Sequence, residues 1–361
     1  MVLSACGGGD VLDTPVPPEG VWMKGDLHLH SDHSSDALDN PMTAIIGQAE
    51  DRGMDYFVVT DHDNHVDGQL TTWDDPAYRS DRMVLLYGAE WTTAKGHANF
   101  FAPTRYDHGA LYALREGEGV AIAQEADRQG AHFSANHPLN GDPWEYGFDI
   151  GLDSLEVWNA LFRFPGDNRQ VLALWDQLLA TGRRLPGRGG SDCHHQQGIE
   201  PLGLNVGTPT TWVYAASRSP DAVVAALDAG RASVSYAPDA ERIALWADVD
   251  RDGRYETLMG DNVAVAPGTP VDFRIDIEGF RALGTYTVTV IKNGAVLQRF
   301  RLPLSAPLTF TDTPAADGRS YYRVEVEGNT PDAETLPAQL VGFYGRFIGL
   351  TNPIYFGFDR P

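Results

Sequence analysis

Cysteine, basic residues and long apolar runs are all scarce in this chain, and each scarcity excludes a class of protein. With only two cysteines, Cys6 and Cys193, among 361 residues, the chain has no disulfide framework. Its 27 lysines and arginines against 50 acidic residues give a net charge of -23, which argues against nucleic acid or an anionic membrane surface as a partner. No stretch approaches the roughly 20 apolar residues of a membrane-spanning helix. A small anionic substrate stays compatible, because bound cations reverse the local sign of the field.

The first 20 residues are similar to the start of an exported bacterial lipoprotein. "LSAC", ending at Cys6, resembles a lipobox whose cysteine is lipidated, and the glycines and prolines that follow are typical of a flexible tether. The charged and apolar parts of a signal peptide do not precede the motif, so a clipped leader and a chance match are both open. We expect a lipid-anchored, extracytoplasmic protein, periplasmic or on the outer surface of a bacterium.

Two patterns divide the rest of the chain. In residues 21–237 short apolar runs alternate with helical patterns, which predicts an α/β region with a parallel sheet, for which a barrel is the closed form. In residues 238–361 polar and apolar residues alternate with period two, which predicts a smaller all-β, sandwich-like domain. Asn293-Gly294 predicts a hairpin turn within that domain. The helices of the first region are expected at residues 42–53, 119–130, 168–182 and 219–233.

Histidine, aspartate and glutamate gather where the expected strands end. In "DLHLHSDHSSDA" His28 and His30 are two apart, so both side chains share one face of a strand, and Asp192 and His194 in "GGSDCHH" have the same spacing. Because the carboxyl ends of parallel strands meet at one face, we expect these groups to form one site. The candidate ligands are His28, His30, Asp36, His62, Glu90, His97, His137, Asp192 and His194.

Each motif alone has an ordinary structural explanation, but their succession predicts a metal centre. A single HxH is more often surface than ligand, "TDHD" alone is a capped turn, and "ANHP" alone is a strand closed by proline. Imidazole and carboxylate together suit Zn, Mn or Fe, whereas a calcium cage is built from oxygen. Cys193 lies between two candidate ligands and should face the other way, as a small core residue.

The ordered motifs "DLHLHSDHSSDA", "VVTDHDNH", "GAEWTT…GHANFF", "ANHP" and "GGSDCHH" resemble the PHP (polymerase and histidinol phosphatase) superfamily of metal-dependent hydrolases. The resemblance covers residues 22–236. "LEVWN" and "TNPIYF" are similar to the branch that contains carbaryl hydrolase and microcin-processing proteins, which also carries a C-terminal β appendage. The resemblance implies a distorted (βα)7 barrel that holds two or three divalent transition-metal ions.

The resemblance also implies a ligand set for each ion. The first ion would be held by His28, His30, Glu90 and Asp192. Glu90 would bridge to a second ion, which would be completed by His97 and His137. A third ion would be held by Asp36, His62 and His194. Asp36 stands where other members of the superfamily carry histidine. The remaining histidines receive no ligand role: His33, His65, His108, His132 and His195.

The expected activity is hydrolysis by a hydroxide that bridges the metal ions, with Asp192 as a ligand essential to catalysis. The resemblance favours a phosphoester substrate. Carbamate, ester or amide hydrolysis on the same site is the alternative, and a non-catalytic, metal-containing binding lipoprotein is a third hypothesis. Asp63 and His65 are candidates for donating a proton or orienting water, against capping or supporting roles. Arg163 and Arg188 are candidates for clamping a phosphate, against ordinary ion pairs.

One further stretch, "DVDRDGRYETLMGD", resembles a calcium loop. Asp248, Asp250, Asp252 and Gly253 occupy the positions that such a loop requires, but Met259 replaces the bidentate glutamate. The sequence therefore favours a tight turn with solvated aspartates, and a weak calcium site stays open.

Overall fold

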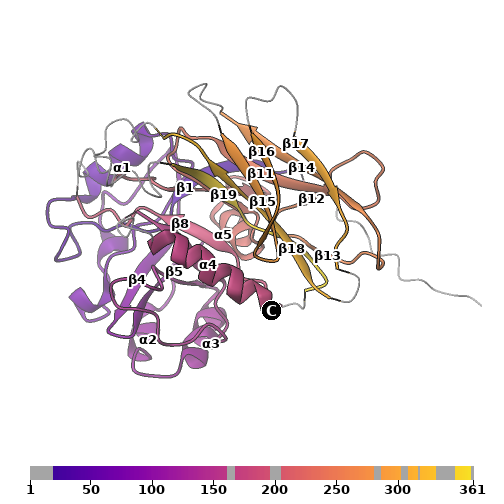
Figure 1. The fold of residues 1–361 in the computed structure, drawn as a ribbon. Helices are drawn as coiled ribbons and strands as arrows, with labels where there is room; N and C mark the ends of the chain where they lie inside the picture. Colours follow the sequence, from indigo (N-terminus) through magenta and orange to yellow (C-terminus); the bar gives the residue numbers. More distant parts are fainter. Residues whose placement is uncertain are drawn as a thin grey trace, which may run out of the picture.

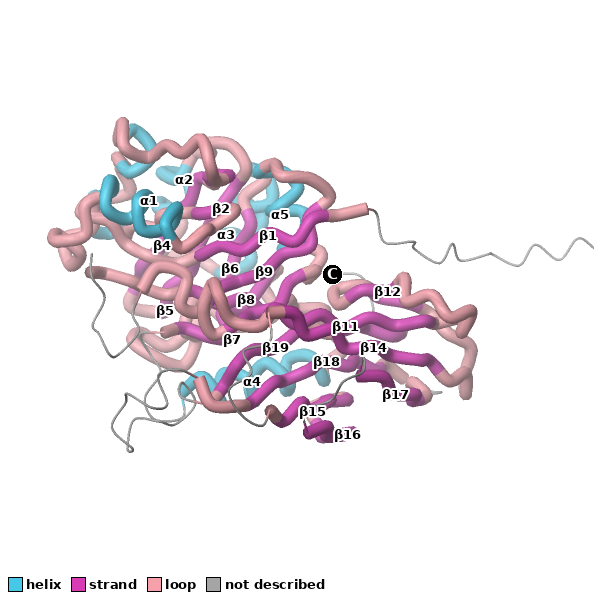
Figure 2. Tube along the Cα trace, turned by 90° about the horizontal axis from the view of Figure 1, so that it is seen from above, coloured by secondary structure: helices cyan, strands magenta, loops and turns pink. Residues whose placement is uncertain are grey.

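The computed structural model describes residues 19–160, 167–195, 205–279, 286–301, 308–315, 318–330 and 346–358. A region that contains the helices of the described residues lies beside a region made of strands, and the two are in contact (Figures 1 and 2). Cys6 and Arg163 lie outside the described residues. Within the described part of the chain, every helix is too short or too polar to cross a membrane.

The first region is built on two sets of strands. In one, β9 (Thr210–Ala215), β1 (Val21–Asp26), β2 (Tyr56–Phe57) and β3 (Val84–Leu85) are neighbours, and β1, β2 and β3 are parallel. The other is a five-stranded sheet in sequence order, with β6, β7 and β8 parallel. Its strands are β4 (Tyr87–Thr93), β5 (Gly96–Ala102), β6 (His132–Ala135), β7 (Ser154–Asn159) and β8 (Gly187–Gly190).

The two sets of strands approach each other at both edges. Only Leu86 separates β3 from β4 along the chain. On the other side the Thr211 hydroxyl of β9 accepts from the Gly189 amide of β8 (2.9 Å) and donates to its carbonyl (3.0 Å). The mixed α/β character expected from the sequence is confirmed. A closed (βα)7 barrel stays a prediction.

The sheet that was expected to be parallel also contains antiparallel pairs. Strands β4 and β5 form an antiparallel hairpin, β5 runs antiparallel to β6, and β9 runs antiparallel to β1. Only Ala94 and Lys95 connect β4 to β5, and a parallel crossover needs a dozen residues or more. The chain therefore reverses directly, with Gly96 at φ 119° in the turn.

Helices form at the four places where the sequence predicts them, with differences at their ends, and one further short helix, at His108–Ala113, was not predicted. Helix α3 ends because Gly130 adopts a left-handed conformation with φ 66°. Helix α5 is capped by the Ser219 side chain, which accepts a hydrogen bond from the Ala222 amide, and Pro220 lies in its first turn. The helices are α1 (Met42–Asp51), α2 (His108–Ala113), α3 (Gly119–Gln129), α4 (Asp167–Ala180) and α5 (Pro220–Asp228). Two short 3-10 helices are η1 (Asp63–Val66) and η2 (Thr72–Asp74).

The second region packs a four-stranded antiparallel sheet against the outer strands of a larger sheet. A buried cluster that includes Phe273, Tyr322 and Phe356 fills the space between them. The expected hairpin joins β15 and β16, with Asn293 and Gly294 both at positive φ. The smaller sheet contains β12 (Thr257–Leu258), β11 (Arg242–Asp248), β14 (Val271–Glu278) and β17 (Leu308–Asp312). Opposite lie β13 (Asn262–Val263), β15 (Thr287–Lys292), β16 (Ala295–Arg301), β18 (Ser320–Glu327), β19 (Phe347–Thr351) and β20 (Ile354–Phe356).

The two regions share one sheet and one core. Strand β10 (Ala232–Ser235) pairs with β9 on one side and with β19 on the other, so the chain's last strands extend the sheet of the first region. Trp158 of β7 packs edge-on against Phe347 of β19, with ring centroids 5.1 Å apart. The strand pairing of β9, β10 and β19 therefore continues across the domain boundary that was expected after residue 237.

Candidate metal centre

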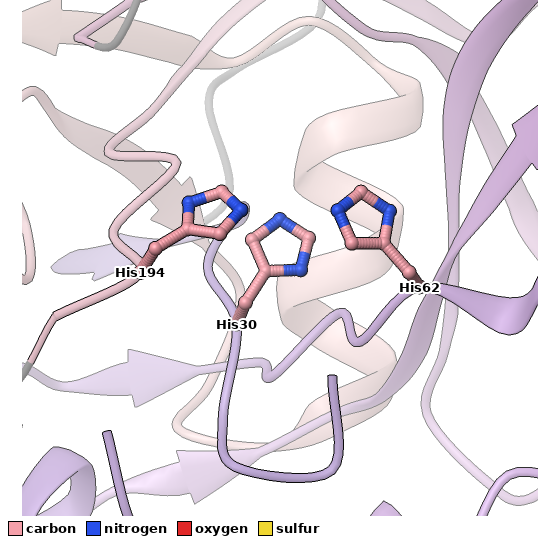
Figure 3. A group of neighbouring side chains, drawn as sticks. All are labelled: His30, His62 and His194. Carbon is pink, nitrogen blue, oxygen red and sulfur yellow. The ribbon is translucent and has the colours of Figure 1, made fainter. Parts of the chain in front are cut away.

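Eight of the nine candidate ligands place side-chain nitrogens and oxygens within 4.8 Å of one another in four overlapping groups. Figure 3 shows one group, in which the rings of His62 and His194 stand on either side of His30. The His30 ring is stacked on both, at centroid distances of 4.2 and 4.1 Å. The four groups are His30, His62 and His194; His28, His137 and Asp192; His28, His30 and Glu90; and His62, Glu90 and His97.

Glu90 lies at the centre of the cluster. One carboxylate oxygen, Oε1, is 3.2 Å from His28 Nε2, 3.2 Å from His97 Nδ1 and 3.4 Å from His137 Nε2. The other, Oε2, is 2.8 Å from His62 Nδ1. Each oxygen therefore faces a different set of imidazoles, which is the arrangement that a bridging carboxylate requires.

The β4–β5 hairpin explains why His97 reaches Glu90. Thr92 pairs with His97 across the hairpin, and Glu90 is two residues from Thr92 on the same strand. Side chains two apart share a face, and directly opposed residues share it too, so Glu90 and His97 point to one side. The sequence spacing alone did not disclose this register.

Asp192 is a second carboxylate that contacts several imidazoles. Its Oδ1 is 3.2 Å from His30 Nε2 and 3.4 Å from His28 Nε2. Its backbone has φ 51°, and that of His137 has φ 22°, values that residues other than glycine seldom adopt. Two candidate ligands thus occupy backbone conformations of the kind that concentrate at functional sites.

Asp36 approaches the cluster from its open side. Its Oδ2 lies 3.3 Å from His62 Nε2 and 3.6 Å from His194 Nε2, and its side chain is 45% exposed. The other candidate ligands are buried or largely buried. Asp36 and His194 are the most exposed of the candidate ligands, and His62 lies in contact with Asp36.

The donor set fits divalent transition-metal ions. His28 Nε2, His30 Nδ1 and His97 Nε2 are buried and form no hydrogen bond within the described residues. Buried polar atoms without partners are costly, and a cation supplies the missing interaction. Imidazole nitrogens with carboxylate oxygens suit Zn, Mn or Fe.

Burial and neighbouring charges act against each other on the cluster. Burial by itself lowers the pKa of His28, but Asp192, Glu156 and Glu90 raise that pKa well above its usual value. Burial, with His194 and His62 beside it, lowers the pKa of His30 well below its usual value. Burial would raise the pKa of Glu90, but His28, His62 and His97 hold it well below the usual range. The carboxylates are therefore ionised, as ligands must be.

A supporting layer beneath the ligands was missed at the sequence level. Glu156 Oε1 lies 2.9 Å from His28 Nδ1, and its Oε2 accepts from the His137 amide (2.9 Å). Asn159 donates to Glu156 (2.9 Å) and to Asp192 (3.1 Å), and Asn136 donates to Glu90 (2.7 Å). The signal was present in "SLEVWN", where a glutamate interrupts a fully buried strand and therefore needs partners.

Arg188 belongs to this supporting layer and does not face a substrate. It is fully buried, and its guanidinium donates to Glu156 Oε1 (3.0 Å), to the Ser134 hydroxyl (2.7 Å) and to Asn136 Oδ1. A phosphate clamp needs donors that reach the open side of the cluster. The structure instead gives Arg188 the ion pair that was its alternative role.

The two candidates for proton transfer differ in their positions. Asp63 is buried and accepts from the Thr92 amide (2.9 Å), and its other oxygen lies 2.9 Å from His108 Nε2, so its carboxylate is occupied within the fold. The His65 ring lies at the open side, 4.8 Å from the His62 ring, with Nδ1 3.8 Å from Asp36. Only His65 therefore stands where it can meet a substrate.

The histidines without an assigned ligand role all have other partners. His33 lies 3.0 Å from Asp75, His195 lies 3.0 Å from Asp39, and His132 contacts Asp228 at 2.6 Å. Cys193 is buried, and its thiol donates to the His195 carbonyl at 3.3 Å.

The acidic loop of the second region forms the expected turn. Asp248 accepts from the amides of Asp252 (3.2 Å) and Gly253 (2.8 Å). Carboxylate oxygens of Asp248, Asp250, Asp252 and Glu256 lie within 4.8 Å of one another. Glu256 was not among the sequence candidates.

Comparisons with known proteins give remote similarities. No protein-family model and no curated protein matches the chain. A solved two-domain protein from Bacteroides vulgatus, described as containing a predicted PHP-like metal-dependent phosphoesterase, is 17% identical over 86% of this chain and 92% of its own, with a TM-score of 0.44. A Bifidobacterium adolescentis protein, whose function as a metal-dependent phosphoesterase is itself an inference, is 18% identical over 56% and 94%, with a TM-score of 0.36. At this level of similarity, the assignment of the centre rests on this chain's own residues.

Proposed function

We propose that this protein is a metal-dependent hydrolase whose substrate is a phosphoester. The observation that carries the proposal is the position of Glu90, whose two oxygens face separate sets of imidazoles within one buried cluster. This is the arrangement of a multinuclear centre. The phosphoester preference follows from the motifs that resemble the PHP superfamily, and carbamate, ester and amide bonds are the alternatives.

The residues divide the work by position. His28, His30, Glu90, His97, His137 and Asp192 would hold two ions in the buried part, and Asp36, His62 and His194 would hold another at the open face. Ions held there would lower the pKa of water and neutralise charge that develops on the substrate. His65, at the open side, is suited to give a proton to the leaving group or to orient water. Arg188 is buried and does not reach the open side, so ions held at the open face would bind the substrate's charge, with Arg163 as the remaining candidate clamp.

The test is a substrate panel on the full chain loaded with Mn, Fe or Zn. The panel contains phosphomonoesters, phosphodiesters, aryl carbamates and carboxylic esters. We expect turnover of a phosphoester that disappears with chelation and returns with metal. Asp192→Asn and His137→Ala should lower both metal content and turnover. His195→Ala, which changes an exposed histidine paired with Asp39, is the matched control and should retain both.

Two outcomes would redirect the proposal. Bound metal without turnover on any member of the panel would favour a non-catalytic binding protein. Turnover restricted to carbamates or carboxylic esters would keep the metal centre and overturn the phosphoester assignment.

A further inference from the structure

A second cavity lies away from the metal centre, between the first region and the loop that precedes β18. Its volume is ≈ 830 Å³, within the range of pockets that bind small molecules. The segments before β7 and before β8 line one part of it, and the end of α4 and Arg319 line the rest. It therefore draws on both regions of the molecule.

The cavity gathers positive charge in an acidic protein. Arg183, Arg184 and Arg319 all line it, although the chain as a whole carries a net charge of -23. Arg183 is half-buried, and its nearest carboxylate, Asp149 at 3.6 Å, is fully exposed, so solvent screens that pair. Burial lowers the pKa of Arg183, which shows that water is partly withdrawn from its charge.

Arg184 is held in place by groups that do not neutralise it. Its Nη2 donates to the Gly260 carbonyl at 2.8 Å, and its guanidinium lies 5.5 Å from the centroid of the Tyr355 ring. Its Nε is buried and forms no hydrogen bond among the described residues. The side chain is thus fixed with its charge uncompensated, and a bound anion would supply what is lacking.

The other residues that line the cavity are Asp149, Asp153 and Thr181, together with apolar or small residues. The three arginines outnumber the two carboxylates, Asp149 is fully exposed, and burial raises the pKa of Asp153. Phe148, Leu152 and Leu178 contribute side chains, and Gly182 brings the backbone close to Arg319. A Cβ atom at Gly182 would lie 1.8 Å from Arg319 Nη1, so a larger residue there would displace this arginine. Apolar walls with a few convergent charged groups are typical of sites for amphiphilic small molecules.

The cavity and the metal centre lie at opposite ends of the same strands. Asp153, which lines the cavity, directly precedes β7, whose last residue Asn159 donates to Asp192. Six residues of extended strand span about 20 Å. A ligand in the cavity therefore does not contact the metal ligands, and the cavity is a separate site.

We propose that this cavity binds a small organic oxyanion, a phosphate or carboxylate that carries an apolar group. The anion contacts Arg183, Arg184 and Arg319, and the apolar group packs against Phe148, Leu152 and Leu178. The site is independent of the hydrolytic function, because none of its residues belongs to the metal centre.

The test is calorimetric titration of the full, metal-loaded chain with phenylphosphonate, benzoate, inorganic phosphate and benzyl alcohol. We expect the two aromatic anions to bind at the cavity, inorganic phosphate to bind it more weakly and the neutral alcohol not to bind. Arg183→Gln combined with Arg319→Gln should weaken cavity binding at least about tenfold, because each charged hydrogen bond lost is worth that much. Comparison of phenylphosphonate with benzoate distinguishes the two oxyanions.

Matched variants separate this site from others. Arg128→Gln removes one arginine charge from the surface of α3, half the change in charge of the double variant, and should leave binding unchanged. Glu90→Gln, in the metal centre, should remove any binding of phenylphosphonate there and leave benzoate binding at the cavity intact. Binding that survives the double arginine substitution, an equal loss in Arg128→Gln, or no binding of either aromatic anion to the unaltered protein would overturn the proposal.

Discussion

Two buried charged clusters in this molecule differ in whether their polar atoms find hydrogen-bond partners within the chain. In the first region, the metal centre concentrates imidazoles and carboxylates and leaves three buried nitrogens without a hydrogen bond among the described residues. Between the regions, Arg323 of β18 is buried as deeply, and its guanidinium is surrounded by acceptors. Its Nε and Nη2 donate to the two oxygens of Asp176 on α4, at 2.8 and 2.6 Å, and its Nη1 donates to Glu325 at 2.6 Å.

This difference in hydrogen bonding distinguishes a cluster that stabilises the fold from one that is suited to bind a ligand. The network of Arg323, Asp176 and Glu325 is complete within the chain, and the Tyr321 hydroxyl adds a further hydrogen bond to Asp176 (2.8 Å). Such a network holds α4 against the second region and needs nothing from solution. In the candidate metal centre, three buried ring nitrogens form no hydrogen bond among the described residues. A buried polar atom of this kind is therefore the better indicator of a ligand.

The largest expected effect follows from removal of the central carboxylate of the metal centre. Glu90→Gln keeps the shape of the side chain and removes the charge that faces both sets of imidazoles. We expect loss of bound metal and a fall in turnover of at least about a hundredfold. Metal analysis and steady-state kinetics measure the two losses. Full metal content in a folded Glu90→Gln protein would contradict the bridging role.

Breaking the network of Arg323, Asp176 and Glu325 should lower the free energy of unfolding without changing metal affinity. Arg323→Met leaves Asp176 and Glu325 without their cation, and we expect a loss of about 3 kcal/mol in the free energy of unfolding. Urea denaturation measures it. Changing Asp176→Leu and Glu325→Gln as well should recover most of the loss, because an apolar replacement of a buried ion network is often neutral. A lower metal affinity in Arg323→Met would show that the two clusters are coupled.

The supporting layer of the metal centre should give an intermediate effect. Glu156→Gln removes the carboxylate beside His28 Nδ1 and the ion-pair partner of Arg188. We expect metal affinity to fall by about 10- to 100-fold, as measured by competition with a chelator. Glu325→Gln, the same substitution in the complete network, is the control and should leave the affinity unchanged.

The acidic loop of the second region should give the smallest effect. Asp248 already accepts hydrogen bonds from backbone amides within the turn. In this respect the loop resembles the network of Arg323, Asp176 and Glu325 more than it resembles the metal centre. We expect 1 mM calcium to stabilise the full chain by no more than about 1 kcal/mol. Thermal melts with and without calcium check this, with Asp250→Asn as the comparison. A larger rise that Asp250→Asn abolishes would establish a calcium site.

Local patterns allowed the helices and the hairpin at Asn293-Gly294 to be predicted, because caps, glycines and apolar spacing act over a few residues. Strand direction was harder to predict. The β4–β5 hairpin depends on a connection of two residues, which the strand patterns did not disclose. The candidate ligands could be proposed because they fall at strand ends. Glu156 was missed although it interrupts an apolar strand, because the histidine that it supports lies 128 residues away in the sequence.

Arg188 illustrates the limit of reasoning from residue type. An arginine before "GGSD" is equally compatible with a phosphate clamp and with a buried ion pair, and only the packing of β8 against β6 and β7 decides between them. A neighbouring glutamate inside an apolar strand was the one local hint, and the sequence does not say that the two strands lie side by side.

The pairing of β10 with β19 has a consequence for how the molecule is made. Ser233 of β10 is in register with Thr351 of β19, and Trp158 of β7 packs against Phe347 of β19. During synthesis from the amino terminus, the first region therefore emerges before β19 can pair with β10 and before Phe347 can contact Trp158. Long-range pairing of this kind folds slowly and exposes intermediates to aggregation. The second region thus completes the sheet in which β1 leads to His28 and His30.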